Sequence, residues 1–175
     1  MIDEIQITAS GSTEPVTLKE AKAFLKVDYN DSDDLIKDLI TAAREQIESY
    51  CSVSLITHTV KVFGSGFIQC QLPYYPVDSS SIVLTDENSN TITGFERLGD
   101  KKAYVEYNGS EAIRYTFTYN TTAISNKSLL IALMHYVKWM WDNSDMARTS
   151  VGFTSFITDK MNLDAKNIMD QFRLL

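Results

Sequence analysis

The spacing of apolar residues changes twice along the 175-residue chain, and this limits the folds that it can adopt. Between residues 17 and 51 apolar side chains recur every three or four positions, which is the period of an amphipathic helix. Between residues 56 and 119, β-branched and aromatic residues alternate with polar ones, which indicates strands. Helical spacing returns after residue 125. The pattern predicts an α+β fold whose helices come from both ends of the chain.

Two helices are expected in the N-terminal third. Thr17 and Glu20 have the spacing of a capping box, in which the Thr17 hydroxyl accepts the Glu20 amide and the Glu20 carboxylate reaches back to the Thr17 amide. This predicts a first helix over about 17–26. A second helix is predicted over about 32–51, and its apolar stripe consists of Leu35, Ile36, Leu39, Ile40, Ala43, Ile47 and Tyr50.

The middle of the chain predicts about six short strands between residues 56 and 119. Residues 57–63 and 67–72 flank a Gly-Ser-Gly sequence, so we expect them to pair as a hairpin. Asn108-Gly109 is the dipeptide most favoured in two-residue turns, and it predicts a second hairpin between the strands on either side of it.

A third helix is predicted over about 127–142 and a fourth over about 160–172. The third is apolar around nearly its whole circumference, so it must be buried on several sides. Because a domain of this size rarely surrounds a helix completely, part of its surface is expected at a contact between subunits. The residues predicted there are Leu130, Met134, Val137, Trp139 and Trp141.

The domain organisation that follows is a helical core with an insertion. Residues 1–55 and 120–175 are expected to form the core, including a C-terminal arm, and residues 56–119 the β-rich insertion. An apolar content of 44 % excludes wholesale disorder. The N-terminus lacks the basic and apolar regions of a signal peptide, and the longest apolar stretch is too short to cross a bilayer. No membrane association is therefore predicted.

No constellation of residues predicts chemistry. The two histidines, His58 and His135, lie in a strand pattern and in the apolar helix, and Cys51 and Cys70 lack the spacing of a zinc site. The acidic turn that begins at Asp28 resembles a calcium loop only at its start, because the later glycine and bidentate glutamate are missing. We assign no catalytic residue, no cofactor and no metal site.

Two phrases in the N-terminal third carry a family resemblance. Residues 16–28 read V-T-L-K-E-A-K-A-F-L-K-V-D, and residues 43–50 read A-R-E-Q-I-E-S-Y. They strongly resemble the opening helices of the head–tail connector (neck adaptor) family of long-tailed bacteriophages and prophages. The apolar residues 129–141 and the phrase at 168–173 are similar to that family's third helix and closing segment. Many members have a shorter stretch where this chain has its β-rich block.

The resemblance implies a structural protein that catalyses nothing. Its copies would form a ring, typically dodecameric, on the portal in the neck of the virion, after synthesis in the cytoplasm of the bacterial host. The ring would extend the channel for double-stranded DNA toward a stopper or tail protein without reading the DNA sequence. The C-terminal arm would bind the portal through Ile168, Met169, Phe172 and Arg173.

The net charge of −7 fits a channel through which DNA passes without being gripped. Sixteen basic residues against 23 acidic ones leave little scope for neutralising phosphates. A ring of about a dozen copies would be an acidic collar, and an acidic lumen would repel the DNA backbone.

Two other functions stay open from the sequence. The first is a different neck component, such as a stopper or tail-completion protein, which would have a more β-rich core. The second is a small cytoplasmic ligand-binding or enzymatic domain, which would need a deep polar pocket with perturbed titratable groups.

Overall fold

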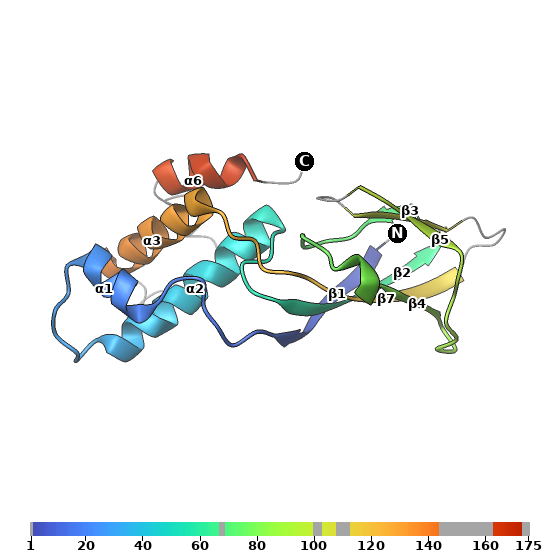
Figure 1. The fold of residues 1–175 in the computed structure, drawn as a ribbon, viewed down its shortest axis with the longest axis horizontal. Helices are drawn as coiled ribbons and strands as arrows, with labels where there is room; N and C mark the ends of the chain where they lie inside the picture. Colours follow the sequence, from blue (N-terminus) through green and yellow to red (C-terminus); the bar gives the residue numbers. More distant parts are fainter. Residues whose placement is uncertain (1, 67–68, 100–102, 108–112, 144–162, 173–175) are drawn as a thin grey trace. The chain divides into compact units, whose positions relative to one another are not determined.

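The computed structural model describes residues 2–66, 69–99, 103–107, 113–143 and 163–172 (Figure 1). The chain divides into two compact units. One contains Met1–Thr13 and Val53–Ile124 and is built of strands, and we call it the β unit. The other contains Glu14–Ser52 and Ser125–Leu175 and is built of helices, and we call it the helical unit. The predicted α+β class is confirmed.

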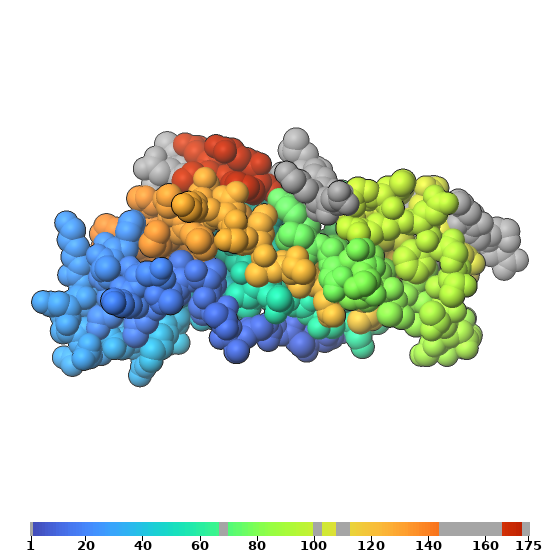
Figure 2. Space-filling view, viewed as in Figure 1, coloured from blue at the N-terminus to red at the C-terminus, as the bar shows by residue number. Residues whose placement is uncertain are grey.

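Over its described residues, the helical unit contains α1 (Leu18–Leu25), α2 (Asp33–Cys51), α3 (Lys127–Asp142) and α6 (Leu163–Asp170). Helix α3 packs against each of the other three, and its buried face explains its apolar character. In Figure 2 the atoms of α6, in red, lie on the surface beside those of α3, in orange. Each of these four helices lies within the range that the sequence predicts, and some are shorter than predicted by one to three residues at an end.

Side chains at the helix termini explain where two of these helices begin. Thr17 caps α1 as predicted, because its hydroxyl accepts the Glu20 amide at 3.3 Å while the Glu20 carboxylate accepts the Thr17 amide at 2.8 Å. Asn126 caps α3, and its side-chain oxygen accepts the amides of Ser128 at 2.9 Å and Leu129 at 3.3 Å. These bonds satisfy amides that have no partner within the helix.

The β unit contains two antiparallel sheets. The larger has the order β1–β2–β7–β4, formed by Ile2–Ser10, His58–Gly66, Ile113–Asn120 and Val83–Asp86. The smaller has the order β3–β6–β5, formed by Gln69–Gln71, Tyr104–Tyr107 and Phe95–Leu98. A short 3₁₀ helix spans Ser79–Ser81. The core contains Val60, Val62, Leu84 and Phe117 from the larger sheet and Cys70 and Val105 from the smaller.

Both predicted hairpins are wrong. Strand β2 pairs with β1 on one side and β7 on the other, so neither of its edges is open to β3. Strand β3 instead pairs with β6 in the smaller sheet, where Cys70 and Val105 help to form the core. The strands on either side of Asn108-Gly109 likewise belong to different sheets, because β6 pairs with β3 and β5 while β7 pairs with β2 and β4.

The sequence predicts no element at the N-terminus, where the structure has β1. Residues 1–13 group with the β unit because β1 pairs with β2. Every residue of β1 after Ile2 is exposed, so the strand lacks the alternation of buried and exposed positions that marks most strands.

Candidate interaction surfaces

Helix α3 was predicted to supply a contact between subunits, and its five predicted residues differ in burial. Val137 is only 2 % exposed and belongs to the core of the helical unit. The other four predicted residues, Leu130, Met134, Trp139 and Trp141, are half-buried. Each of these four leaves part of its apolar surface available to a partner.

The most exposed large apolar residue of α3 is not among the five predicted from the sequence. Ile131 is 44 % exposed. His135, one turn further on, is half-buried and packs edge-on against Phe24 of α1, with ring centroids 5.3 Å apart. Because Ile131 lies in a nearly continuous apolar run, the sequence does not indicate that this side of α3 is exposed to solvent.

Helix α6, the predicted arm, is fixed to α2 through its C-terminal turn. Met169 is 1 % exposed, and its carbonyl accepts a hydrogen bond from the Cys51 thiol at 3.5 Å. The Tyr50 hydroxyl donates to the Asp170 carboxylate. Ile168 and Phe172 are half-buried, and Arg173 lies outside the described residues. Of the four predicted arm residues, Met169 therefore contributes to the protein's own core.

Arg44 and Glu48, in the phrase at residues 43–50, belong to a buried ion network that the sequence does not predict. Arg44, 6 % exposed, donates from Nε to Glu14 and from Nη1 to Glu48, at 2.8 Å in each case. Thr41 also donates to Glu14, at 3.0 Å. Glu48 is itself only 3 % exposed. The network holds the chain that leads into α1 against α2.

Ion pairs and hydrogen bonds account for the acidic turn between α1 and α2. The Lys22 ammonium lies 2.6 Å from the Asp33 carboxylate and 2.8 Å from the Asn30 side-chain oxygen. Asp34 pairs with Lys37 at 2.8 Å, and hydrogen bonding to that lysine lowers the pKa of Asp34. Tyr29, at the tip of the turn, is 50 % exposed.

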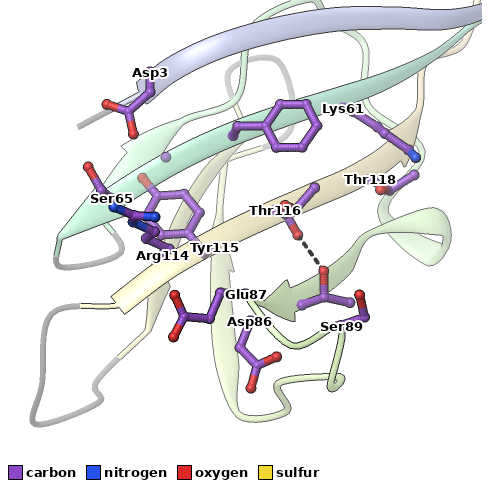
Figure 3. Close-up of a pocket in the computed structure, with 13 residues that line it drawn as sticks. Asp3, Lys61, Ser65, Asp86, Glu87, Ser89, Arg114, Tyr115, Thr116 and Thr118 are labelled. Atoms are coloured by element: carbon purple, nitrogen blue, oxygen red, sulfur yellow. Dashed lines mark hydrogen bonds between the residues drawn. The ribbon is translucent and has the colours of Figure 1, made fainter.

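The β unit carries an open hollow on the larger sheet, with a volume of about 720 Å³ (Figure 3). It brings Lys61 and Arg114 together with three carboxylates, those of Asp3, Asp86 and Glu87. Hydrogen bonds from Asn90 and Asn88 lower the pKa of Asp86, so this carboxylate is already engaged in holding the turn that follows β4. The hollow has mixed charge and is wide open, which suits a contact with another protein better than an enclosed small molecule.

No described group of side chains has the arrangement of a reactive centre. His58 is 4 % exposed and its Nδ1 lies 2.9 Å from the Ser10 hydroxyl, an exposed partner on the neighbouring strand. Over the described residues, no three His, Cys, Asp or Glu side chains gather in a way that could hold a metal ion. No described helix is both long and apolar enough to span a membrane.

The predicted family resemblance is confirmed by a comparison with family models. Residues 15–90 match the model described as "Phage gp6-like head-tail connector protein". The match begins just before α1 and runs through α2 into the β unit as far as the turn after β4. No curated protein sequence matches the chain.

The fold is similar to chains in solved structures of gene transfer agent particles. One, in "Neck of empty GTA particle computed with C6 symmetry", has a TM-score of 0.72 and 13 % identity over 99 % of this chain and 96 % of that one. Another, in "Neck of native GTA particle computed with C12 symmetry", has a TM-score of 0.68 and 14 % identity over the same shares. A third, in "Virion of native gene transfer agent (GTA) particle", has a TM-score of 0.70 and 14 % identity over 98 % and 95 %. These shares include both units, so the β unit is part of the shared fold.

Proposed function

We propose that this structural head–tail connector protein acts as one subunit of a ring in the neck of a phage-like particle. The ring of twelve copies would sit below the portal and continue the DNA channel toward the stopper or tail. The subunits would be made in the host cytoplasm and incorporated into the virion. The role is structural and requires no catalysis.

One observation carries this proposal: the family match and the fold match fall on the same chain. The family model covers the helix pair α1–α2 and the start of the β unit. The fold match extends over both units, and two of the similar chains belong to neck structures computed with sixfold and twelvefold symmetry. Cyclic symmetry of that kind is the symmetry of a closed ring.

The half-buried residues of α3 would provide the contact with the neighbouring subunit. Leu130, Met134, Trp139 and Trp141 retain exposed apolar surface, and large apolar and aromatic side chains dominate the energetics of protein interfaces. Val137 would support these residues from within the core. Met134→Lys is expected to prevent ring formation while leaving the subunit folded. Ser128→Lys, at an exposed position of the same helix, is the matched control.

The C-terminal arm would bind the portal through Ile168, Phe172 and Arg173, with Met169 fixing the arm to α2. Deleting residues 167–175 would remove the core contact of Met169 as well, so point variants are the cleaner test. Ile168→Ser together with Phe172→Ser is expected to abolish binding to purified portal protein. Asn167→Ser, at an exposed position of the same helix, should bind as the wild type does. Unchanged binding of the double variant would contradict the arm assignment.

The acidic balance of the chain supports a channel that does not grip DNA. With a net charge of −7 per subunit, a ring would repel phosphates wherever acidic residues line its lumen. The ring is therefore expected not to retard double-stranded DNA in a gel, even at low salt. A ring whose lumen is lined by Lys and Arg would overturn this part of the proposal.

The direct test of the ring is assembly on the portal. The protein is mixed with its portal protein, and the complex is examined by native mass measurement and by electron microscopy. We expect twelve copies per portal and an added ring of density on one face of it. A protein that stays monomeric and leaves the portal unchanged would contradict the proposal.

A further inference from the structure

Strand β1 is the open edge of the larger sheet. It pairs with β2 on one side, and no described residue pairs with its other side. The opposite edge of the sheet is already covered, because the Ile92 amide donates to the Leu84 carbonyl at 2.8 Å and Thr91 forms a bridge with Thr85. The N-terminal segment, dark blue in Figure 2, forms part of the molecular surface. Among the described strands of this sheet, only β1 therefore offers a free row of backbone donors and acceptors.

Two isoleucines on β1 extend the apolar face of the sheet beyond its core. Ile5 and Ile7 lie opposite Val62 and Val60, which are fully buried, so all four side chains are on the same face. The isoleucines are nevertheless 45 % and 44 % exposed. An open backbone edge with apolar side chains at alternate positions is the recognition surface for an added strand.

We propose that this edge binds β1 of a second copy, antiparallel and about a twofold axis that passes through Gln6. The sequence Ile5-Gln6-Ile7 reads the same in both directions, so the axis sets Ile5 of each copy opposite Ile7 of the other. The four isoleucines then form one cluster on the core side of a continuous eight-stranded sheet. Apolar β-branched pairs of this kind stabilise neighbouring strands.

The charges on β1 favour this arrangement over its alternatives. About the axis at Gln6, Glu4 lies opposite Thr8 and Asp3 opposite Ala9, so no two acidic residues face one another. A parallel pair in the same register would set Glu4 against Glu4 and Asp3 against Asp3, which is destabilising. The polar and charged residues of the strand therefore also select the twofold pair.

The proposed dimer would form between subunits that are not assembled in a ring, so this proposal goes beyond the ring assembly. A twofold contact is isologous and closes on itself, so it cannot repeat around a cyclic ring. Irregularities in the β1–β2 register on either side of Glu4–Ile7 also limit how far the new ladder can extend. Because one short strand pair buries little surface compared with the roughly 1,000 Å² of a stable interface, the dimer is expected to be weak and to depend on protein concentration.

Disulfide trapping tests the axis directly. In Gln6→Cys the two introduced thiols would face each other across the axis, at a separation that a disulfide can span. We expect this variant to form a covalent dimer at least about tenfold faster than Leu98→Cys, whose side chain is similarly open to solvent at 52 % exposure. The native Cys51 and Cys70 are buried and should not compete. Equal rates for the two variants would overturn the proposal.

A second measurement uses the uncrosslinked protein. Sedimentation at increasing concentration is expected to show a monomer–dimer equilibrium for the wild type. Ile7→Lys should weaken the dimer at least about tenfold, because a desolvated lysine would enter the isoleucine cluster. Val83→Lys is the matched control, because Val83 is equally exposed in the same sheet but lies at the covered edge. A wild type that is monomeric at every concentration, or a dimer that survives Ile7→Lys, would contradict the pairing, and neither outcome bears on the ring.

Discussion

The guanidinium of Arg44 donates a 2.8 Å hydrogen bond to the carboxylate of Glu48, one turn further along α2, and both side chains are withdrawn from water. A second bond from the same guanidinium reaches Glu14, so one cation joins the chain before α1 to α2. Burial opposes the charge of Arg44, but its hydrogen bonds to Glu14 and Glu48 outweigh burial and raise its pKa. Arg44 therefore stays charged in the folded protein and needs its acidic partners.

Removing one partner of this pair should destabilise the helical unit strongly. Glu48→Ala leaves the buried guanidinium without one of its two close carboxylates, and we expect a loss of about 3–5 kcal/mol in the free energy of unfolding. Urea denaturation monitored by circular dichroism measures it. Glu45→Ala is the control, because Glu45 is exposed and lies 3.6 Å from Arg44, and it should cost less than about 1 kcal/mol. Similar losses for the two variants would contradict a special role for Glu48.

The sequence predicts α2 but not this pair, and the reason is physical. Helical spacing identifies the apolar stripe, and Arg44 and Glu48 lie outside it as charged residues expected in water. Their burial depends on Glu14, which lies 30 positions from Arg44 and is brought close only by the packed fold. The same limit applies to α3 and α6, where spacing marks Val137 and Met169 as apolar but does not say that the protein's own core covers them.

The capping box of α1 gives a second prediction. Thr17→Ala removes the hydroxyl that accepts the Glu20 amide, and should lower the free energy of unfolding by about 1 kcal/mol. The Thr17 hydroxyl also donates a hydrogen bond to the Glu20 carboxylate at 2.6 Å, and this bond lowers the pKa of Glu20 in the wild type. In Thr17→Ala the bond is lost, so the pKa of Glu20 should rise toward its ordinary value in an NMR titration. Thr17→Ser keeps the hydroxyl and should preserve both properties. An unchanged Glu20 pKa in Thr17→Ala would contradict the capping role.

Gly64 gives a third prediction, because it faces Tyr115 across the β2–β7 ladder. A methyl group at position 64 would lie 2.5 Å from two atoms of the Tyr115 side chain, which is closer than real contacts allow. Gly64→Ala should therefore destabilise the protein by about 1–3 kcal/mol in urea denaturation. Adding Tyr115→Leu should recover part of this loss, since the smaller side chain leaves room for the methyl group. Losses that simply add in the double variant would show that the contact is not the cause.

The strands were predicted well as segments and poorly as pairs. Alternation places β2 and β7 close to their observed positions, because both have buried residues at every second position. Pairing depends on which edges are free, and local turn signals such as Asn108-Gly109 carry no information about β2 and β4 occupying both edges of β7. Strand β1 was missed because its alternation of apolar and polar residues is short, being limited essentially to Ile5, Gln6 and Ile7.

Buried tyrosines in the β unit and the helical unit predict a loss of stability at alkaline pH. Burial raises the pKa of Tyr115 to about 12, and the neighbouring Cys70 adds to this shift, whereas an unfolded tyrosine ionises near pH 10. The folded state therefore holds the phenolic proton longer than the unfolded chain does. The stability linked to this group is intact below about pH 10 and is lost as the pH rises toward 12.

Tyr115→Phe isolates this contribution. Tyr119 and Tyr136 also have pKa values raised by burial, so the wild type and the variant should both lose stability above pH 10. The variant should lose less, because one fewer group releases its proton on unfolding. At pH 7 the two proteins should differ by less than about 1 kcal/mol, since the polar neighbour of the Tyr115 hydroxyl is the Cys70 thiol, which is a weak hydrogen-bonding group. Urea denaturation at pH 8, 10 and 11 measures the difference, and parallel losses for both proteins would show that Tyr115 titrates alike in the folded and unfolded states.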